Sequence, residues 1–100
     1  MTLQSLLTQF YTDLVTVERL AELSARTYEE SAKVFLDWCV KEEIKLRDIT
    51  SQNLLYFVVW RKEQGCDALT VAKDIAGLRA LGSFLVREKI WAENVAKEID

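Results

Sequence analysis

Hydrophobic residues recur every three or four positions along most of this 100-residue chain, which is the spacing of one face of an α-helix. The first such segment predicts a helix over residues 3–20. Its apolar face is wide, as a helix packed against more than one neighbour requires. This face is formed by Leu3, Leu6, Leu7, Phe10, Leu14 and Val17.

A second helix is predicted from Ser24 to about Glu42. The hydrophobic pattern breaks over residues 20–24, and the side-chain oxygen of Ser24 can accept a hydrogen bond from a free amide of a first helical turn. The expected buried side of this helix carries Tyr28, Ala32, Phe35, Trp38 and Cys39.

A third helix is predicted from Thr50, a candidate N-cap, to Gly65, a candidate terminator. The run from Tyr56 to Trp60 has strong strand propensity. Polar residues flank this run at helical spacing, however, and a lone strand would have no partner in this chain. Helix is therefore the favoured interpretation.

Asp67 can cap a fourth helix over residues 69–88, whose apolar seam runs from Val71 to Leu85. Another strip of this helix places small residues between two cations, in the order Lys73, Ala76, Gly77, Ala80 and Arg87. Such a strip allows close packing against another helix or close approach to a ligand such as DNA, and the pattern leaves both open.

Residues 91–99 are either a last helical turn or a linker. The predicted fold is an all-α bundle of four or five helices.

The composition is that of one soluble globular domain, with 50% hydrophobic and 29% charged residues. Proline is absent and glycine occurs three times, which excludes collagen-like folds and disfavours turn-rich β folds. The apolar run at residues 54–60 is far shorter than a membrane span. No secretory signal is apparent, so we expect a cytoplasmic protein without membrane partners.

The absence of histidine excludes His-dependent nucleophilic catalysis and His-ligated zinc. Cys39 and Cys66 could form a redox pair, but the favoured interpretation places Cys39 in the core and Cys66 in a turn. Adjacent acids diverge by about 100° on a helix, so they do not converge on a catalytic site. Trp38 and Trp60 are interpreted as core residues rather than base-stacking groups. We therefore expect no catalytic residue, metal, cofactor or small-molecule substrate.

Charge is unevenly distributed. The chain has a net charge of −3, yet residues 68–89 carry four basic and two acidic side chains. Positive charge is thus concentrated on the predicted fourth helix, where it could meet an anionic partner.

Several segments resemble tyrosine recombinases of the Xer type and phage integrases. They are Ser24-Ala25-Arg26-Thr27, the run Leu46–Leu54, the run Leu69–Arg79, and Phe84–Lys89. Their order and spacing agree with that family through all four predicted helices. Two positions depart from its pattern: Ser31 stands where the family has an aromatic residue, and Asn94-Val95 where it has Asn-Pro.

This resemblance implies the SAM-like, N-terminal core-binding domain of such a recombinase, a compact orthogonal helical bundle. In that family the domain forms half of a clamp around duplex DNA and a separate C-terminal domain performs the chemistry. The implied partners are duplex DNA and other recombinase protomers, at a nucleoid-associated location. Residues 1–94 would form the domain, and residues 95–100 would begin a linker to an absent catalytic domain. The chain alone would be a non-catalytic fragment.

By the same resemblance, Lys73 and Arg79 match basic positions on the helix that faces DNA, and Thr27 matches a hydroxyl near the DNA backbone. Arg26 and Arg87 are flanking candidates. Such residues would neutralise phosphates or hydrogen-bond to them. The alternative is an acidic helical protein–protein interaction adaptor that does not bind DNA. A DNA clamp needs both Lys73 and Arg79 exposed on one surface.

Overall fold

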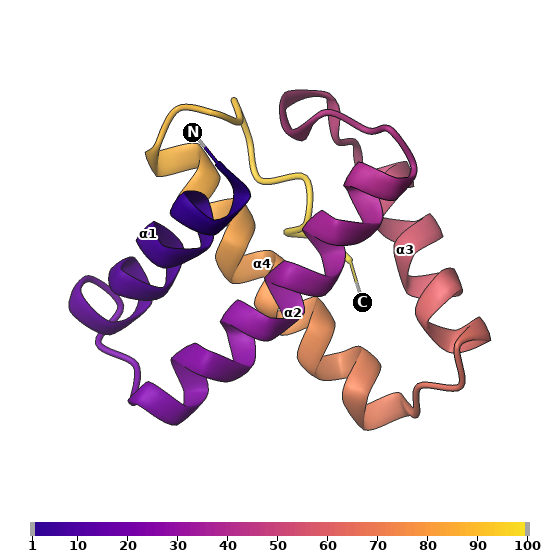
Figure 1. The fold of residues 1–100 in the computed structure, drawn as a ribbon, viewed down its shortest axis with the longest axis horizontal. Coiled ribbons are helices and arrows are strands. Elements are labelled where there is room, and N and C mark those ends of the chain that lie inside the picture. The colour runs from indigo at the N-terminus through magenta and orange to yellow at the C-terminus, as the bar shows by residue number, and fades with distance from the viewer. Residues whose placement is uncertain (1, 100) are drawn as a thin grey trace.

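The computed structural model describes residues 2–99, and these residues form four α-helices (Figure 1). They are α1 (Leu3–Thr16), α2 (Glu22–Lys41), α3 (Ser51–Glu63) and α4 (Ala68–Arg87), with a single 3₁₀ turn, η1 (Leu46–Asp48), between α2 and α3. The described residues contain no strand. The all-α prediction is confirmed, including a helix through Tyr56–Trp60.

Two predicted helix starts are confirmed by their hydrogen bonds. Thr50 and Asn53 form a reciprocal capping box, in which the Asn53 amide donates to Thr50 Oγ1 at 3.2 Å and the Thr50 amide donates to Asn53 Oδ1 at 2.8 Å. The Thr70 amide donates to Asp67 Oδ1 at 2.8 Å. This bond to the charged carboxylate lowers the pKa of Asp67.

The boundary between the first two helices differs from the prediction. α1 ends at Thr16 because Arg19 takes a positive φ of 57° and turns the chain back, so that the Leu20 amide donates to the Leu14 carbonyl at 2.9 Å. Ser24 is not the N-cap of α2. That place belongs to Ala21, which has no side-chain acceptor, and the acidic Glu22 in the first turn favours the positive helix end instead.

α2, α3 and α4 all end in a Schellman motif. In this motif one residue adopts a left-handed conformation, and the amide of the next residue donates to a carbonyl in the last turn of the helix. Gly65 serves this purpose in α3, with φ of 86°, as predicted. In α2 and α4 the left-handed residues are Glu43 (φ 59°) and Lys89 (φ 60°). The following amides of Ile44 and Ile90 donate to Cys39 and Leu85 carbonyls at 2.8 and 2.9 Å.

The longest helices, α2 and α4, cross at the centre of the molecule, with α1 and α3 on opposite sides of the crossing (Figure 1). A Cβ atom at Gly77 would lie 2.9 Å from Ser31 Cβ, so only glycine allows this approach. Gly77 is buried. Of the two interpretations of the small-residue strip, close packing against a helix is therefore the one that applies to Gly77.

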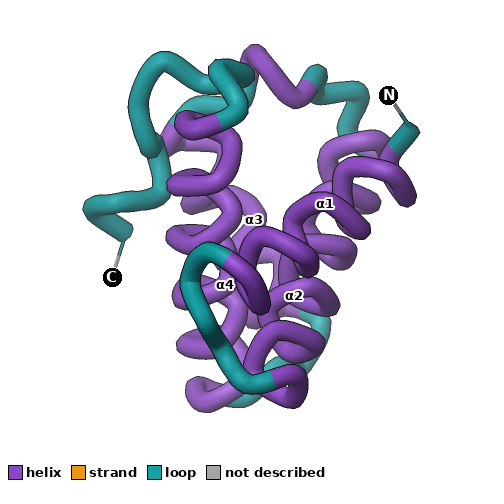
Figure 2. Tube along the Cα trace, turned by 90° about the vertical axis from the view of Figure 1, so that its left-hand side faces the viewer, coloured by secondary structure: helices purple, strands orange, loops and turns teal. Residues whose placement is uncertain are grey.

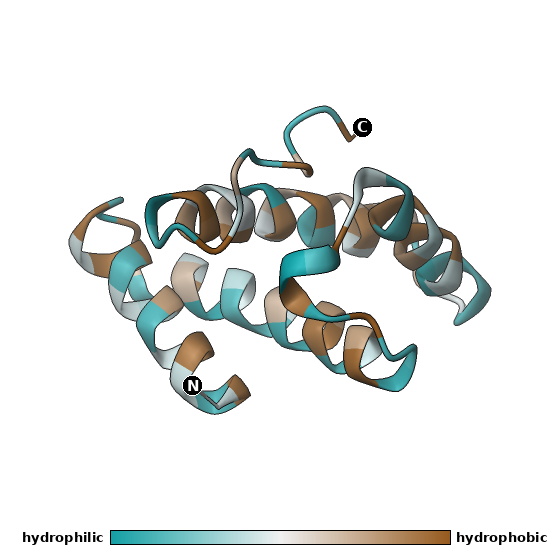
Figure 3. Cartoon of the chain, turned by 90° about the horizontal axis from the view of Figure 1, so that it is seen from above, coloured by the Kyte–Doolittle hydropathy of each residue, from teal (hydrophilic) through white to brown (hydrophobic). Residues whose placement is uncertain are grey.

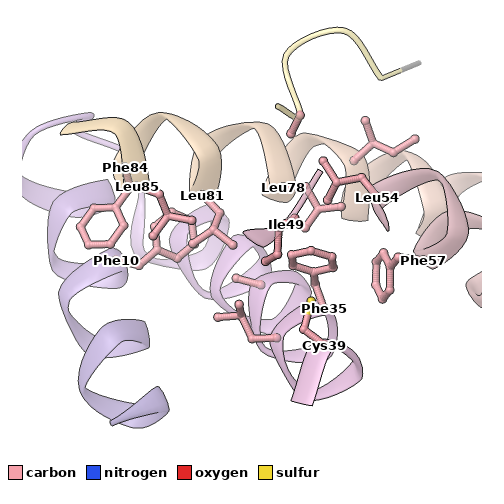
Figure 4. Packing of buried hydrophobic residues seen from close by; sticks show 14 of the residues in the cluster. Phe10, Phe35, Cys39, Ile49, Leu54, Phe57, Leu78, Leu81, Phe84 and Leu85 are labelled. Carbon is pink, nitrogen blue, oxygen red and sulfur yellow. The ribbon is translucent and has the colours of Figure 1, made fainter. Parts of the chain in front are cut away.

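The core fills the spaces on both sides of this crossing (Figure 4). On the α3 side, the rings of Phe35 and Phe57 meet edge to face with centroids 5.1 Å apart, and Trp38 lies 5.5 Å from Phe57. On the α1 side, Phe10 packs against Phe84 at 5.6 Å. Hydrophobic residues of α1, α2 and α4 gather on the core-facing side, as amphipathic helices require (Figure 3). By contrast, α3 also exposes hydrophobic residues, namely Leu55, Tyr56 and Val59.

Residues 91–99 form turns rather than a helix, and they pack onto the bundle. Trp91, Ala96 and Ile99 are buried, and Trp91 Nε1 donates to the Leu46 carbonyl at 2.9 Å. Asn94 Nδ2 donates to the Arg79 carbonyl at 3.1 Å. We call residues 91–99 the C-terminal strap.

We expect Lys89→Gly to raise the free energy of unfolding by about 1 kcal/mol, because a side chain at positive φ is strained and glycine is not. Urea denaturation followed by circular dichroism measures this change. The matched control is Gly65→Ala, which introduces the same strain and should lower the free energy of unfolding by about 1 kcal/mol. A loss of stability in Lys89→Gly would show that the left-handed conformation is not strained there.

We expect Cys39 to be chemically inert in the native protein. Neither cysteine is in a disulfide, and burial raises the pKa of Cys39 to about 12, so the reactive thiolate is scarce at neutral pH. Titration with Ellman's reagent at pH 8 should label only the half-buried Cys66 rapidly, and both thiols in urea. Equal native rates for Cys39→Ser and Cys66→Ser variants would contradict this expectation.

Candidate nucleic-acid interface

The crossing of α2 and α4 determines which predicted DNA-contacting residues lie together. Thr27 comes four residues before Ser31 in α2, and Lys73 comes four residues before Gly77 in α4. Four residues are about one turn, or about 6 Å, and residues so spaced share a helix face. Thr27 and Lys73 therefore flank the crossing on the side where both helices begin, at the lower edge of Figure 1. We call this region the N-terminal edge.

Lys73 is the most available cation at the N-terminal edge. It is exposed, and no ion pair within residues 2–99 involves its ammonium group. The first turns of α2 and α4 lie at the same edge, and their free amides give each helix start a partial positive charge. Each helix start already carries an acidic side chain, Glu22 in α2 and Asp67 in α4, so an anion at this edge would depend mainly on the Lys73 ammonium group.

Thr27 and Arg26 are already engaged by protein groups. The half-buried Thr27 donates its hydroxyl to the Leu23 carbonyl at 3.1 Å. Arg26 pairs with Glu29 at 2.8 Å, and its guanidinium lies 3.8 Å from the centre of the Tyr11 ring. The hydrogen bond to Glu29 raises the pKa of Arg26. Both side chains lie at the N-terminal edge, but each would have to change partner to bind a phosphate.

Arg79 and Arg87 lie away from the N-terminal edge. Arg79 comes six residues after Lys73, which turns it about 120° around α4, and its guanidinium donates to the Ile99 carbonyl of the C-terminal strap. Arg87 is the last residue of α4 and pairs with Asp13 and Glu18. Lys73 and Arg79 are thus both exposed but lie on different faces of α4, so this pair does not form the single basic surface that we expected of a DNA clamp, and of the two only Lys73 lies at the N-terminal edge.

The sequence did not reveal a buried polar network behind this edge. Asp74 is 3% exposed and accepts from Arg61 Nε of α3 at 2.6 Å and from Ser31 Oγ of α2 at 3.0 Å. Asp74 follows Val71 by three residues, which places it on the apolar side of α4. This spacing could have predicted that Asp74 is buried. Its partners lie 13 and 43 residues away, so local pattern could not identify them.

Comparison with known families agrees with this helical arrangement. The family described as "Phage integrase, N-terminal SAM-like domain" matches residues 7–89, which include all of α2, α3 and α4. The chain belongs to this family. The match covers the α2–α4 crossing and the N-terminal edge, so the resemblance inferred from the sequence motifs is confirmed.

The related proteins that match are tyrosine recombinases named XerD. The protein of Pseudomonas putida is 26% identical over 95 residues, which are 95% of this chain and 32% of the relative. That of Pseudomonas aeruginosa is 27% identical over 100 residues, or 99% of this chain and 34% of the relative. The chain thus spans about a third of the length of these relatives. No solved structure matches it.

None of the helices among the described residues is both long enough and apolar enough to span a lipid bilayer. Most hydrophobic residues of the helices pack into the common core, although Leu23, Leu55 and Leu69 are exposed.

Disrupting the Asp74 network should destabilise the fold without requiring any ligand. We expect Asp74→Asn to lower the free energy of unfolding by about 2–3 kcal/mol, because it leaves the mostly buried Arg61 without a counter-charge. Urea denaturation measures the loss.

The apolar double variant Arg61→Met/Asp74→Leu provides the control. It removes both charges together and should recover most of the stability lost in Asp74→Asn. A double variant no more stable than Asp74→Asn would show that the loss in Asp74→Asn does not come from the unpaired Arg61 charge.

Proposed function

We propose that this domain binds duplex DNA through the N-terminal edge, as the non-catalytic part of a longer tyrosine recombinase. The observation that carries the proposal is that Lys73 and Thr27 each lie one helical turn before the close approach of Gly77 to Ser31, in a chain of the phage integrase SAM-like family. The XerD relatives support it, since they are recombinases by name and match almost the whole chain.

Each residue has a distinct part in this proposal. Lys73 neutralises a backbone phosphate and displaces counterions, which makes binding salt-dependent. Thr27 turns its hydroxyl from the Leu23 carbonyl to a phosphate oxygen, and the first-turn amides add neutral hydrogen bonds. Arg26, Arg79 and Arg87 give peripheral contacts, because each would first release a protein partner.

These contacts position the domain on DNA rather than read its sequence, because phosphates carry no base information. We further propose that the domain boundary expected after residue 94 lies later in the chain, because Ala96 and Ile99 are buried in the core, and that the chain leads on toward a catalytic domain. Strand cleavage would belong to that domain, since this chain has no histidine and its relatives are about three times as long. Protomer contacts and a nucleoid location are part of the same proposal.

Fluorescence anisotropy with a mixed-sequence duplex across a salt titration tests the proposed edge. Lys73→Ala should weaken binding about five- to tenfold at low salt and reduce the salt slope by about one phosphate contact. Thr27→Val, which removes a hydroxyl but no charge, should weaken binding and leave the salt slope unchanged.

Lys45→Ala is the matched control, because it removes one exposed lysine at the opposite end of the molecule, just before η1. Equal losses in Lys45→Ala and Lys73→Ala would indicate a non-specific charge effect and overturn the assignment of the edge. Absence of binding at low salt by the folded domain would favour the protein–protein adaptor.

A further inference from the structure

α1 begins and α2 ends at the end of the molecule opposite the N-terminal edge (Figures 1 and 2). An apolar groove lies there, lined by residues of both helices. Its cavity volume is about 470 Å³. Its apolar lining comes from Leu3 and Leu6 of α1, from Leu36 and Val40 of α2, and from Ile44 and Ile90, which follow α2 and α4. We call it the α1–α2 groove.

The Schellman motifs of α2 and α4 build this groove. Ile44 and Ile90 directly follow the left-handed residues Glu43 and Lys89, so the same turn that ends each helix directs an isoleucine to the groove. Val40, in the last turn of α2, remains 69% exposed. Val40 lines the groove together with the other aliphatic residues, so its exposure extends a contiguous apolar surface, and contiguous apolar surface is what marks an interaction site.

The charged side chains that line the groove have a single sign. Lys45 and Arg47 line it, and no acidic side chain among the described residues does so. Neither cation takes part in an ion pair within residues 2–99. Among the described residues, the groove therefore combines apolar walls with two unpaired cations, while the exposed acids Glu42, Glu43 and Asp48 adjoin them in the chain without lining the groove.

We propose that the α1–α2 groove binds an amphipathic helix of a partner protein, whose acidic side chains flank its apolar face. The apolar walls would receive the hydrophobic anchors of one helix face, as in other helix-in-groove contacts. Lys45 and Arg47 would pair with the acidic flanks, and this complementarity selects against a basic helix. Duplex DNA could pair its phosphates with the two cations, but it offers no apolar surface that would pack against the aliphatic walls.

A pair of designed peptides tests this proposal on the 100-residue chain. Both are fluorescein-labelled helices with leucines at positions i, i+3, i+4 and i+7; one carries glutamates beside the leucines and the other lysines. Anisotropy titrations should show the glutamate peptide binding about tenfold more tightly, as two partly exposed charge pairs would provide.

Charge reversal gives the decisive comparison. Lys45→Glu/Arg47→Glu should invert the preference, so that the lysine peptide binds more tightly, while Val40→Ser should weaken both peptides. Lys73→Glu, at the opposite end, is the matched control and should change neither titration. Both reversed residues are exposed, and circular dichroism would verify that the variants fold.

Equal affinity for both peptides, no binding of either, or a preference that survives charge reversal would overturn the proposal. Sedimentation of the chain without peptide tests whether a second copy of the chain fills the groove instead. Self-association that the same charge reversal abolishes would assign the groove to a second copy and overturn the proposal. The result does not depend on DNA binding, which the Lys73 variants test at the other end of the molecule.

Discussion

The arrangement of the bundle depends on one carboxylate. Asp74 of α4 is almost fully buried and holds Ser31 of α2 and Arg61 of α3. Burying a charge is unfavourable unless it is paired and hydrogen-bonded, so three helices must meet in this register. Gly77, one turn along α4, allows the backbones to approach at the same point. The crossing is therefore fixed by a charge requirement as well as by shape.

Both ends of the molecule follow from this crossing. Before it, α2 and α4 diverge toward the N-terminal edge (Figure 1), where the exposed Lys73 lies on the same helix as the exposed Leu69, and the half-buried Thr27 on the same helix as the exposed Leu23. Beyond it, the helices end in Schellman motifs whose isoleucines line an apolar groove together with two cations. One packing constraint thus separates two surfaces of different chemistry. A polyanion suits the first, and an acidic amphipathic helix suits the second.

The sequence predicted those features whose cause is local. The Thr50 and Asp67 caps and the Gly65 terminator were readable because the responsible side chains are adjacent in the chain. The left-handed turns at Arg19, Glu43 and Lys89 were not, because packing of the following residue, rather than a glycine, sets them. For the candidate site, the match of Lys73 to a family position carried no information about its neighbours. That Arg79 would instead hold the carbonyl of Ile99, 20 residues later, required the structure.

The C-terminal strap carries a consequence for sequence variation. A side chain on Gly82 would occupy the space of the Asn94 carboxamide, which bonds to Ser83 and to the Arg79 carbonyl. The residues at positions 82 and 94 therefore cannot change independently of each other. In proteins that share this fold, a larger residue at position 82 should therefore occur together with a smaller residue at position 94. Covariation of these two positions would indicate that the strap packs on α4 in the same way.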